Sequence, residues 1–157
     1  MTLKDIIIAG KFTISEGGGG GGDLSSMNLF ANATFSSGYL DSSGYVKTAG
    51  GSTKEVYSDE IDITGMTTLA LLAAYERTDE FWVGCCWYNS SHGFISRTAP
   101  YNSVVGTCPS VTKITPPANA VYLKITFRTY GEIVCALMNY YDAFDFLEDS
   151  NATKITQ

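Results

Sequence analysis

The stretch that decides the fold is residues 81–88, which read Phe81-Trp82-Val83-Gly84-Cys85-Cys86-Trp87-Tyr88. Successive side chains of a strand point to opposite faces, so the odd-numbered residues share one face and the even-numbered residues share the other. Both faces are apolar or aromatic. Such a strand either lies in the middle of a sheet whose second face is also covered, or displays its aromatic rings to a ligand.

The segments around this strand are also short, alternate in polarity and are separated by turn residues. The cleanest alternation is at 121–130, where the odd-numbered residues up to Phe127 are apolar and the even-numbered ones are polar or aromatic. A turn at Gly131 leads into the apolar run 133–138, which predicts a final antiparallel pair. Helical periodicity is nearly absent. About nine strands are expected from such spacing, which is enough for an all-β antiparallel sandwich of two packed sheets.

Two further segments contribute strands. Residues 38–46 read as a hairpin, because polar residues and Gly44 between Leu40 and Tyr45 supply a turn. The apolar run 69–74 has helical propensity, but its short length and the neighbouring strands favour a buried central strand.

The chain ends differ in composition from this body. Residues 1–16 are β-rich and contain the apolar residues Ile6, Ile7, Ile8, Phe12 and Ile14, which we expect to anchor the chain by adding a strand to a partner. Residues 17–26 include six consecutive glycines and predict a flexible linker. A phosphate-binding loop is a weaker alternative, because no Lys-Ser/Thr pair follows the glycines. Residues 142–157 form an acidic tail, for which a short helix and a strand are both open.

The charge distribution bears on the choice of ligand. The 16 acidic and 10 basic side chains give a net charge of −6, but residues 27–141, the predicted domain, contain nine acidic and seven basic side chains. A negative net charge repels phosphate backbones, so we expect neither nucleic acid nor an anionic membrane as a partner. A nearly neutral, aromatic body suits an uncharged ligand such as a sugar better than a polyanion. No signal peptide or membrane span is apparent, which predicts synthesis in a cytosol.

The residues with catalytic or metal-binding chemistry form no recognisable site. We expect Cys85, Cys86, Cys108 and Cys135 to be reduced, buried thiols, with a disulfide or a metal cluster as the alternative. The single histidine, His92, lies in a turn and is expected to be solvated, although a hydrolase triad with a cysteine stays open. Nothing selects a carboxylate pair from Asp59, Glu60 and Asp62. We therefore expect no enzyme, no zinc and no cofactor, and leave a structural calcium ion as an open alternative.

Aromatic side chains are the better candidates for function. Tyrosine and tryptophan combine a flat apolar face with a polar group, which suits the C–H faces and hydroxyl groups of sugars. For each of them a core position is the competing interpretation. The candidate carbohydrate-binding residues are Tyr39, Tyr45, Trp82, Tyr88, Tyr122, Tyr130 and the neighbouring Arg128.

Five motifs in matching order carry a resemblance to a known family. They are Asn28-Leu29-Phe30, Gly38-Tyr39-Leu40 with Ser43-Gly44, residues 58–65, residues 87–96 and residues 117–125. On these motifs, residues 28–140 resemble the jelly-roll, carbohydrate-binding-like domains of appendage proteins from bacteriophages of Gram-positive hosts. Asn89 and Lys124 depart from that pattern, which usually has Asp and Arg. Either departure is expected to weaken the polar network around the turn at 89–93.

The resemblance implies an antiparallel jelly roll without catalytic activity. It also implies a virion location in a tail, baseplate or head fibre, synthesis in the host cytoplasm, and virion proteins and host cell-surface polysaccharide as partners. A homo-oligomer is expected, and a trimer is one form that fibre proteins take. Phe30, Ile61, Tyr88, Phe94 and Tyr122 are sensible core positions. The alternative function is a purely structural capsid decoration or fibre subunit that binds no sugar.

Overall fold

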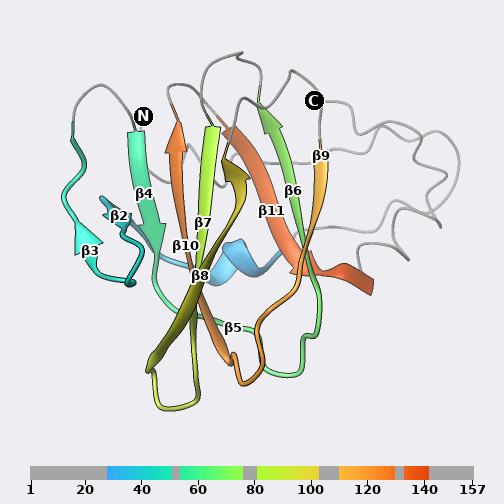
Figure 1. Ribbon diagram of the computed structural model, residues 1–157. Helices are drawn as coiled ribbons and strands as arrows, with labels where there is room; N and C mark the ends of the chain where they lie inside the picture. The colour runs from blue at the N-terminus through green and yellow to red at the C-terminus, as the bar shows by residue number, and fades with distance from the viewer. Residues whose placement is uncertain (1–27, 51–53, 76–80, 103–109, 130–132, 142–157) are drawn as a thin grey trace, which may run out of the picture.

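A computed structural model of the chain describes residues 28–50, 54–75, 81–102, 110–129 and 133–141. They form an all-β sandwich of antiparallel sheets, as the alternating segments predict (Figure 1). The predicted anchor, with Ile6, Ile7, Ile8, Phe12 and Ile14, lies outside the described residues. So do the linker at 17–26 and the tail at 142–157, and these divisions of the chain stay predictions.

The described chain contains one short 3-10 helix and eleven strands. In chain order they are η2 Leu29–Asn32, β1 Phe35–Ser37, β2 Tyr39–Leu40, β3 Val46–Lys47, β4 Lys54–Ser58, β5 Ile61–Asp62, β6 Leu69–Tyr75, β7 Phe81–Tyr88, β8 Phe94–Asn102, β9 Ser110–Ile114, β10 Tyr122–Thr129 and β11 Ile133–Asn139.

Two sheets make up the sandwich. The larger has the order β1-β4-β10-β7-β8, with β5 also paired to β10, and the smaller has the order β11-β6-β9. From β5 to β11 the chain crosses between the two sheets at every connection except that from β7 to β8, which are neighbours in the larger sheet, and this interleaves the sheets as in a jelly roll. The apolar run at 69–74 is the central strand of the smaller sheet, as predicted. Strands β2 and β3 are the hairpin predicted at 38–46, and the strand count exceeds nine because the short strands β1 and β5 add to it.

The main core lies between the two sheets. Strand β7 contributes Val83, Cys85 and Trp87 to it, all fully buried. Helix η2 adds Phe30, whose ring packs edge-on against those of Phe35 and Phe127 at centroid distances of 5.7 and 5.8 Å. The residues of β7 that face the main core are therefore the odd-numbered ones, which the sequence alternation predicts to share one face.

Some of the core positions that the family resemblance implies are buried, and one is not. Phe30 and Ile61 are buried as expected. Phe94 is 38% exposed, so its assignment to the core is wrong. Phe94 begins the edge strand β8, and its ring packs edge-on against that of Tyr88 at a centroid distance of 5.8 Å.

The hairpin of β2 and β3 covers part of the outer face of the larger sheet. Its Leu40 packs with Cys86 and Tyr88 in a second hydrophobic cluster. The Leu40 N–H donates to Thr126 Oγ1 at 3.4 Å, and that hydroxyl donates to the Val56 carbonyl at 3.1 Å. These contacts explain why the even-numbered half of β7 is also apolar.

Two adjacent cysteines show that both faces of β7 are buried. Cys85 lies in the main core and Cys86 in the second cluster, and both are buried free thiols, as is Cys135. Burial raises the pKa of Cys86 to about 11 and raises the pKa values of Cys85 and Cys135 above their ordinary value. Cys108 lies outside the described residues.

We therefore expect these three thiols to resist modification in the folded protein. In a Cys108→Ser variant at pH 8, Ellman's reagent is expected to label essentially no thiol until denaturant is added, because reaction needs an accessible thiolate. Three equivalents should then react. Rapid labelling of the native variant would contradict the burial of both faces of β7.

Candidate functional site

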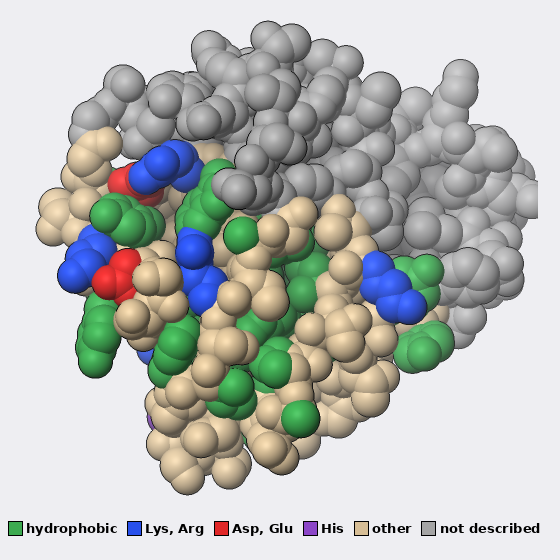
Figure 2. Space-filling view, in the orientation of Figure 1, with side chains coloured by type: hydrophobic (Ala, Val, Ile, Leu, Met, Phe, Trp, Pro, Cys, Tyr) green, Lys and Arg blue, Asp and Glu red, His purple; other side chains and the backbone are tan. Residues whose placement is uncertain are grey.

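A cleft opens on the outer face of the larger sheet, beside the β2–β3 hairpin. Its volume is about 240 Å³. The hairpin and the sheet both supply its walls, which are formed by Tyr39, Leu40, Asp41, Ser42, Trp82, Arg97 and Arg128. Figure 2 shows basic and hydrophobic side chains interleaved on this side of the molecule, where β2, β3, β7 and β8 lie.

Trp82 and Arg97 form one wall. Trp82 lies at the start of β7, and the Arg97 guanidinium of β8 stacks over its ring at 4.3 Å from the centroid. Both side chains lie against Gly84, where an added Cβ would come within 2.8 Å of the Trp82 ring and 2.9 Å of Arg97 Nη2. The lack of a side chain at residue 84 is what allows this close approach.

Arg128 forms the second basic group of the cleft. Its Nε donates to Glu55 Oε1 at 2.6 Å, and Glu55 is only 3% exposed. The Arg128 guanidinium also lies 6.0 Å from the centroid of the Tyr39 ring. Arg128 is therefore held by a buried carboxylate on one side and faces an aromatic ring on the other.

Asp41 shapes the hairpin wall. Its Oδ1 accepts hydrogen bonds from the Ser43 and Tyr45 N–H groups at 2.9 and 3.0 Å, and its Oδ2 pairs with Lys47 Nζ at 3.4 Å. The hydrogen bond from Ser43, followed by that from Tyr45, lowers the pKa of Asp41 below its ordinary value. This carboxylate is thus occupied by the turn that it closes.

The structure brings three of the predicted carbohydrate-binding residues into one cleft, namely Tyr39, Trp82 and Arg128. Tyr45 is 69% exposed on the same hairpin but does not line the cleft. Tyr130 lies outside the described residues.

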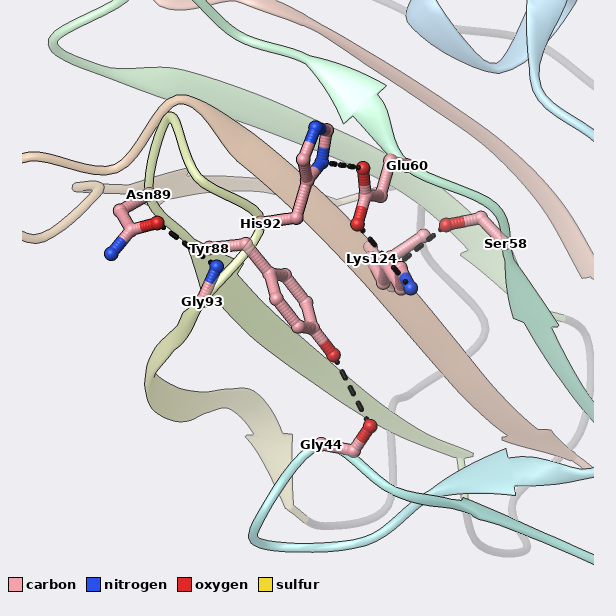
Figure 3. A network of polar contacts seen from close by, with 9 residues as sticks. Gly44, Ser58, Glu60, Tyr88, Asn89, His92, Gly93 and Lys124 are labelled. Atoms are coloured by element: carbon pink, nitrogen blue, oxygen red, sulfur yellow. Dashed lines mark hydrogen bonds and ion pairs between the residues drawn. The ribbon is translucent and has the colours of Figure 1, made fainter.

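Tyr88 is a correction to the predicted set. It is 6% exposed because the hairpin lies over it, and its hydroxyl donates to the Gly44 carbonyl at 3.2 Å (Figure 3). A ring covered in this way offers no face to a sugar. Its alternative assignment, as a core position, is the one that the structure supports.

A polar network surrounds the turn between β7 and β8. His92 Nδ1 lies 2.6 Å from Glu60 Oε2, and Glu60 Oε1 lies 3.5 Å from Lys124 Nζ (Figure 3). The His92 ring also stacks on Tyr122 at a centroid distance of 4.7 Å. The side chain of His92 is 58% exposed, as expected of a loop residue, but these contacts fix its orientation. Tyr122 is partly covered by this stacking and lies at the rim of the second cluster.

The two departures from the family pattern both take part in this network. Asn89 Oδ1 accepts hydrogen bonds from the N–H groups of Ser91 and Gly93, each at 2.9 Å. Lys124 pairs with Glu60 and also lies 4.9 Å from the centroid of the Tyr88 ring. Asn89 and Lys124 therefore both make polar contacts in this network.

Tyr88 gives this region an expected pH dependence. Burial raises the pKa of its phenol from 10.0 to about 12, so the neutral phenol stabilises the fold below pH 10 and this contribution is lost as the pH rises to 12. Tyr88→Phe is expected to cost about 1 kcal/mol at pH 7, through the lost hydrogen bond to Gly44. It should also flatten the fall in stability between pH 10 and 12, measured by urea unfolding.

Tyr45→Phe is the matched control for this variant, because it removes an exposed hydroxyl from the same hairpin. It should leave both the stability at pH 7 and its alkaline slope unchanged. An equal slope in the Tyr88→Phe variant and the parent would contradict the role of the buried phenol.

The described residues give little support for a catalytic site or a metal-binding site. Burial moves the pKa values of Cys85, Cys86 and Cys135 upward, whereas a nucleophilic cysteine needs a lowered pKa. Over the described ranges, no three His, Cys, Asp or Glu side chains are grouped to hold a metal ion. The structural calcium ion stays an untested alternative. No helix within these ranges is long and apolar enough to span a membrane.

Comparison with known proteins adds a distant structural likeness. No protein-family model and no curated protein matches the sequence. Among solved structures, a fucose-binding module from Streptococcus pneumoniae is similar to this chain with a TM-score of 0.37 and 15% sequence identity. The match covers 72% of this chain and 95% of that one. The candidate site is defined by the geometry of the cleft described above.

Proposed function

We propose that residues 27–141 form a non-catalytic carbohydrate-binding module of a bacteriophage virion appendage, which takes a sugar of the host cell surface in the cleft beside the hairpin. The observation that carries the binding part of this proposal is the convergence of Tyr39 and Trp82 with Arg97 and Arg128 in that cleft. Aromatic rings beside hydrogen-bond donors are the combination that a sugar ring requires. The virion part is supported by the sequence motifs alone.

The test is saccharide retention by the full chain, biotinylated and displayed on tetravalent streptavidin so that weak contacts add. Glycan arrays and wall polysaccharides of Gram-positive bacteria are the probes. Trp82→Ala is expected to lower the apparent affinity on the order of 10- to 100-fold, because the indole loses its contact with the sugar. Tyr45→Ala, on the same hairpin but outside the cleft, should bind like the parent.

Two outcomes would reject the binding proposal. One is no retention of any saccharide, which would leave the purely structural decoration or fibre subunit. The other is unchanged retention by the folded Trp82→Ala variant, which would place the sugar elsewhere.

The virion role has its own test. If residues 1–16 anchor the chain, their deletion should remove it from purified particles, as measured by mass spectrometry, while the truncated chain still binds saccharide. Light scattering on both forms would test the proposed homo-oligomer. Normal incorporation of the truncated chain would contradict the anchor.

A further inference from the structure

Arg97 differs from the other charged residues at the cleft, because it has no acidic partner. Arg128 pairs with Glu55, and Lys47 pairs with Asp41. For Arg97, the described part of the chain provides neither an ion pair nor a hydrogen bond. These five groups carry three positive and two negative charges, so the described charged residues at the cleft have a net charge of +1, which belongs to Arg97.

The position of Arg97 is nevertheless fixed. Its guanidinium stacks on Trp82 at 4.3 Å and lies against the backbone of β7 at Gly84. Its Nε is buried and has no hydrogen-bond partner among the described residues. Buried donors in folded proteins are nearly always paired, and an unpaired one is destabilising. Arg97 is thus a positioned cation without an acidic partner among the described residues, and an anionic ligand group at the cleft would supply that partner.

We propose that the saccharide bound in this cleft carries one negatively charged substituent, a carboxylate or a phosphodiester, and that the Arg97 guanidinium binds it. The inference rests on the proposed function and adds the class of sugar. Guanidinium groups bind carboxylate and phosphate oxygens through paired N–H donors, and these charge-assisted hydrogen bonds are stronger than neutral ones. Trp82 would contact the sugar ring while its stacking holds the guanidinium in place.

The proposed ligand carries a single negative charge for a specific reason. The body is nearly neutral overall, which at the level of the sequence favours an uncharged sugar. The structure concentrates one unpaired positive charge at the cleft, which a single anionic group would neutralise. A densely charged polyanion would still be repelled by the net charge of −6.

The experiment compares each acidic oligosaccharide with its own neutral form, and each acidic probe carries a single negative charge. An oligosaccharide with one uronic acid is tested before and after reduction of its carboxylate to an alcohol, and an oligosaccharide with one glycerol phosphodiester is tested beside the same oligosaccharide without that group. The full chain on streptavidin is expected to prefer the acidic member of one pair on the order of 10- to 100-fold at low salt. The preference should weaken as the salt concentration rises. The pair that shows it distinguishes carboxylate from phosphodiester.

Arg97→Gln is expected to reduce this preference to near unity, and Arg97→Lys to restore only part of it. Lys113→Gln is the matched control, since it removes the same charge from β9 of the other sheet. Equal binding of acidic and neutral forms by the parent, or an unchanged preference in the folded Arg97→Gln variant, would overturn this inference alone. Absence of binding to every form would overturn the proposed function as well.

Discussion

Replacing Trp87 by alanine is expected to lower the free energy of unfolding by about 3–5 kcal/mol. Trp87 is fully buried between the two sheets, where it is the largest side chain of the core. Its Nε1 donates to Thr98 Oγ1 at 3.1 Å, so the substitution removes a hydrogen bond as well as apolar contacts. Urea unfolding followed by circular dichroism measures the change without relying on the missing fluorophore.

Trp82→Ala is the matched control for this prediction. It removes the same side chain from the same strand, but on the outer face, where Trp82 is only partly buried. We expect a loss of less than half that of Trp87→Ala, together with the loss of saccharide binding proposed above. Trp87→Phe should recover part of the stability. Equal destabilisation by the two alanine variants would show that the faces of β7 are assigned wrongly.

Gly38→Ala is expected to cost about 2–4 kcal/mol. Gly38 precedes β2 with φ of +124°, in a region that residues with a side chain rarely occupy, and its N–H donates to the Glu55 carbonyl at 3.0 Å. A Cβ at this position would lie 2.5 Å from the backbone oxygen of Lys47, so the hairpin backbone would have to move. Urea unfolding gives the loss, and faster labelling of Cys86 by Ellman's reagent would report displacement of the hairpin.

Two other glycines separate the causes of this effect. Gly65 has φ of +79° but open space around it, so Gly65→Ala should cost about 1 kcal/mol from backbone strain alone. Gly50 does not have a positive φ, and a Cβ added to it would meet no atom within 4 Å, so Gly50→Ala should be nearly neutral. If all three variants lost the same stability, the close contact with Lys47 would not be the cause.

The fold was largely predictable, because apolar and polar residues alternate along the strands that form the core. The pattern at 121–130 predicts the buried face of β10, where Leu123, Ile125 and Phe127 are all fully buried. The run at 69–74 was ambiguous between helix and strand, and its pairing on both sides with β11 and β9 decides for a strand. Propensity alone contains no information about those partners.

The site was only partly predictable, because it depends on contacts between distant segments. Tyr39, Trp82 and Arg128 could be named as aromatic and basic candidates, but nothing in the local sequence shows that the hairpin folds over Tyr88 and stops short of Trp82. The cover over Tyr88 is set by the hydrogen bonds from Leu40 to Thr126 and from Tyr88 to Gly44.

Arg97 was missed for a different reason. Continuing the pairing of Tyr88 with Phe94 along a regular ladder would place Arg97 opposite Cys85, on the core face. A register shift between Trp87 and Tyr88 instead pairs Arg97 with Cys86 and directs it to the outer face. A one-residue irregularity of this kind exchanges the faces of a strand and leaves no clear signature in the sequence.

The two-sided packing of β7 has a consequence for how this protein can change. Substitutions at 83, 85 and 87 alter the main core, whereas those at 82 and 84 alter the cleft wall and leave the main core in place. Selection for folding and selection for a new ligand can therefore act on alternate residues of a single strand. A library that varies residues 39, 82, 97 and 128 while keeping the odd-numbered residues of β7 would explore new specificities on an unchanged scaffold.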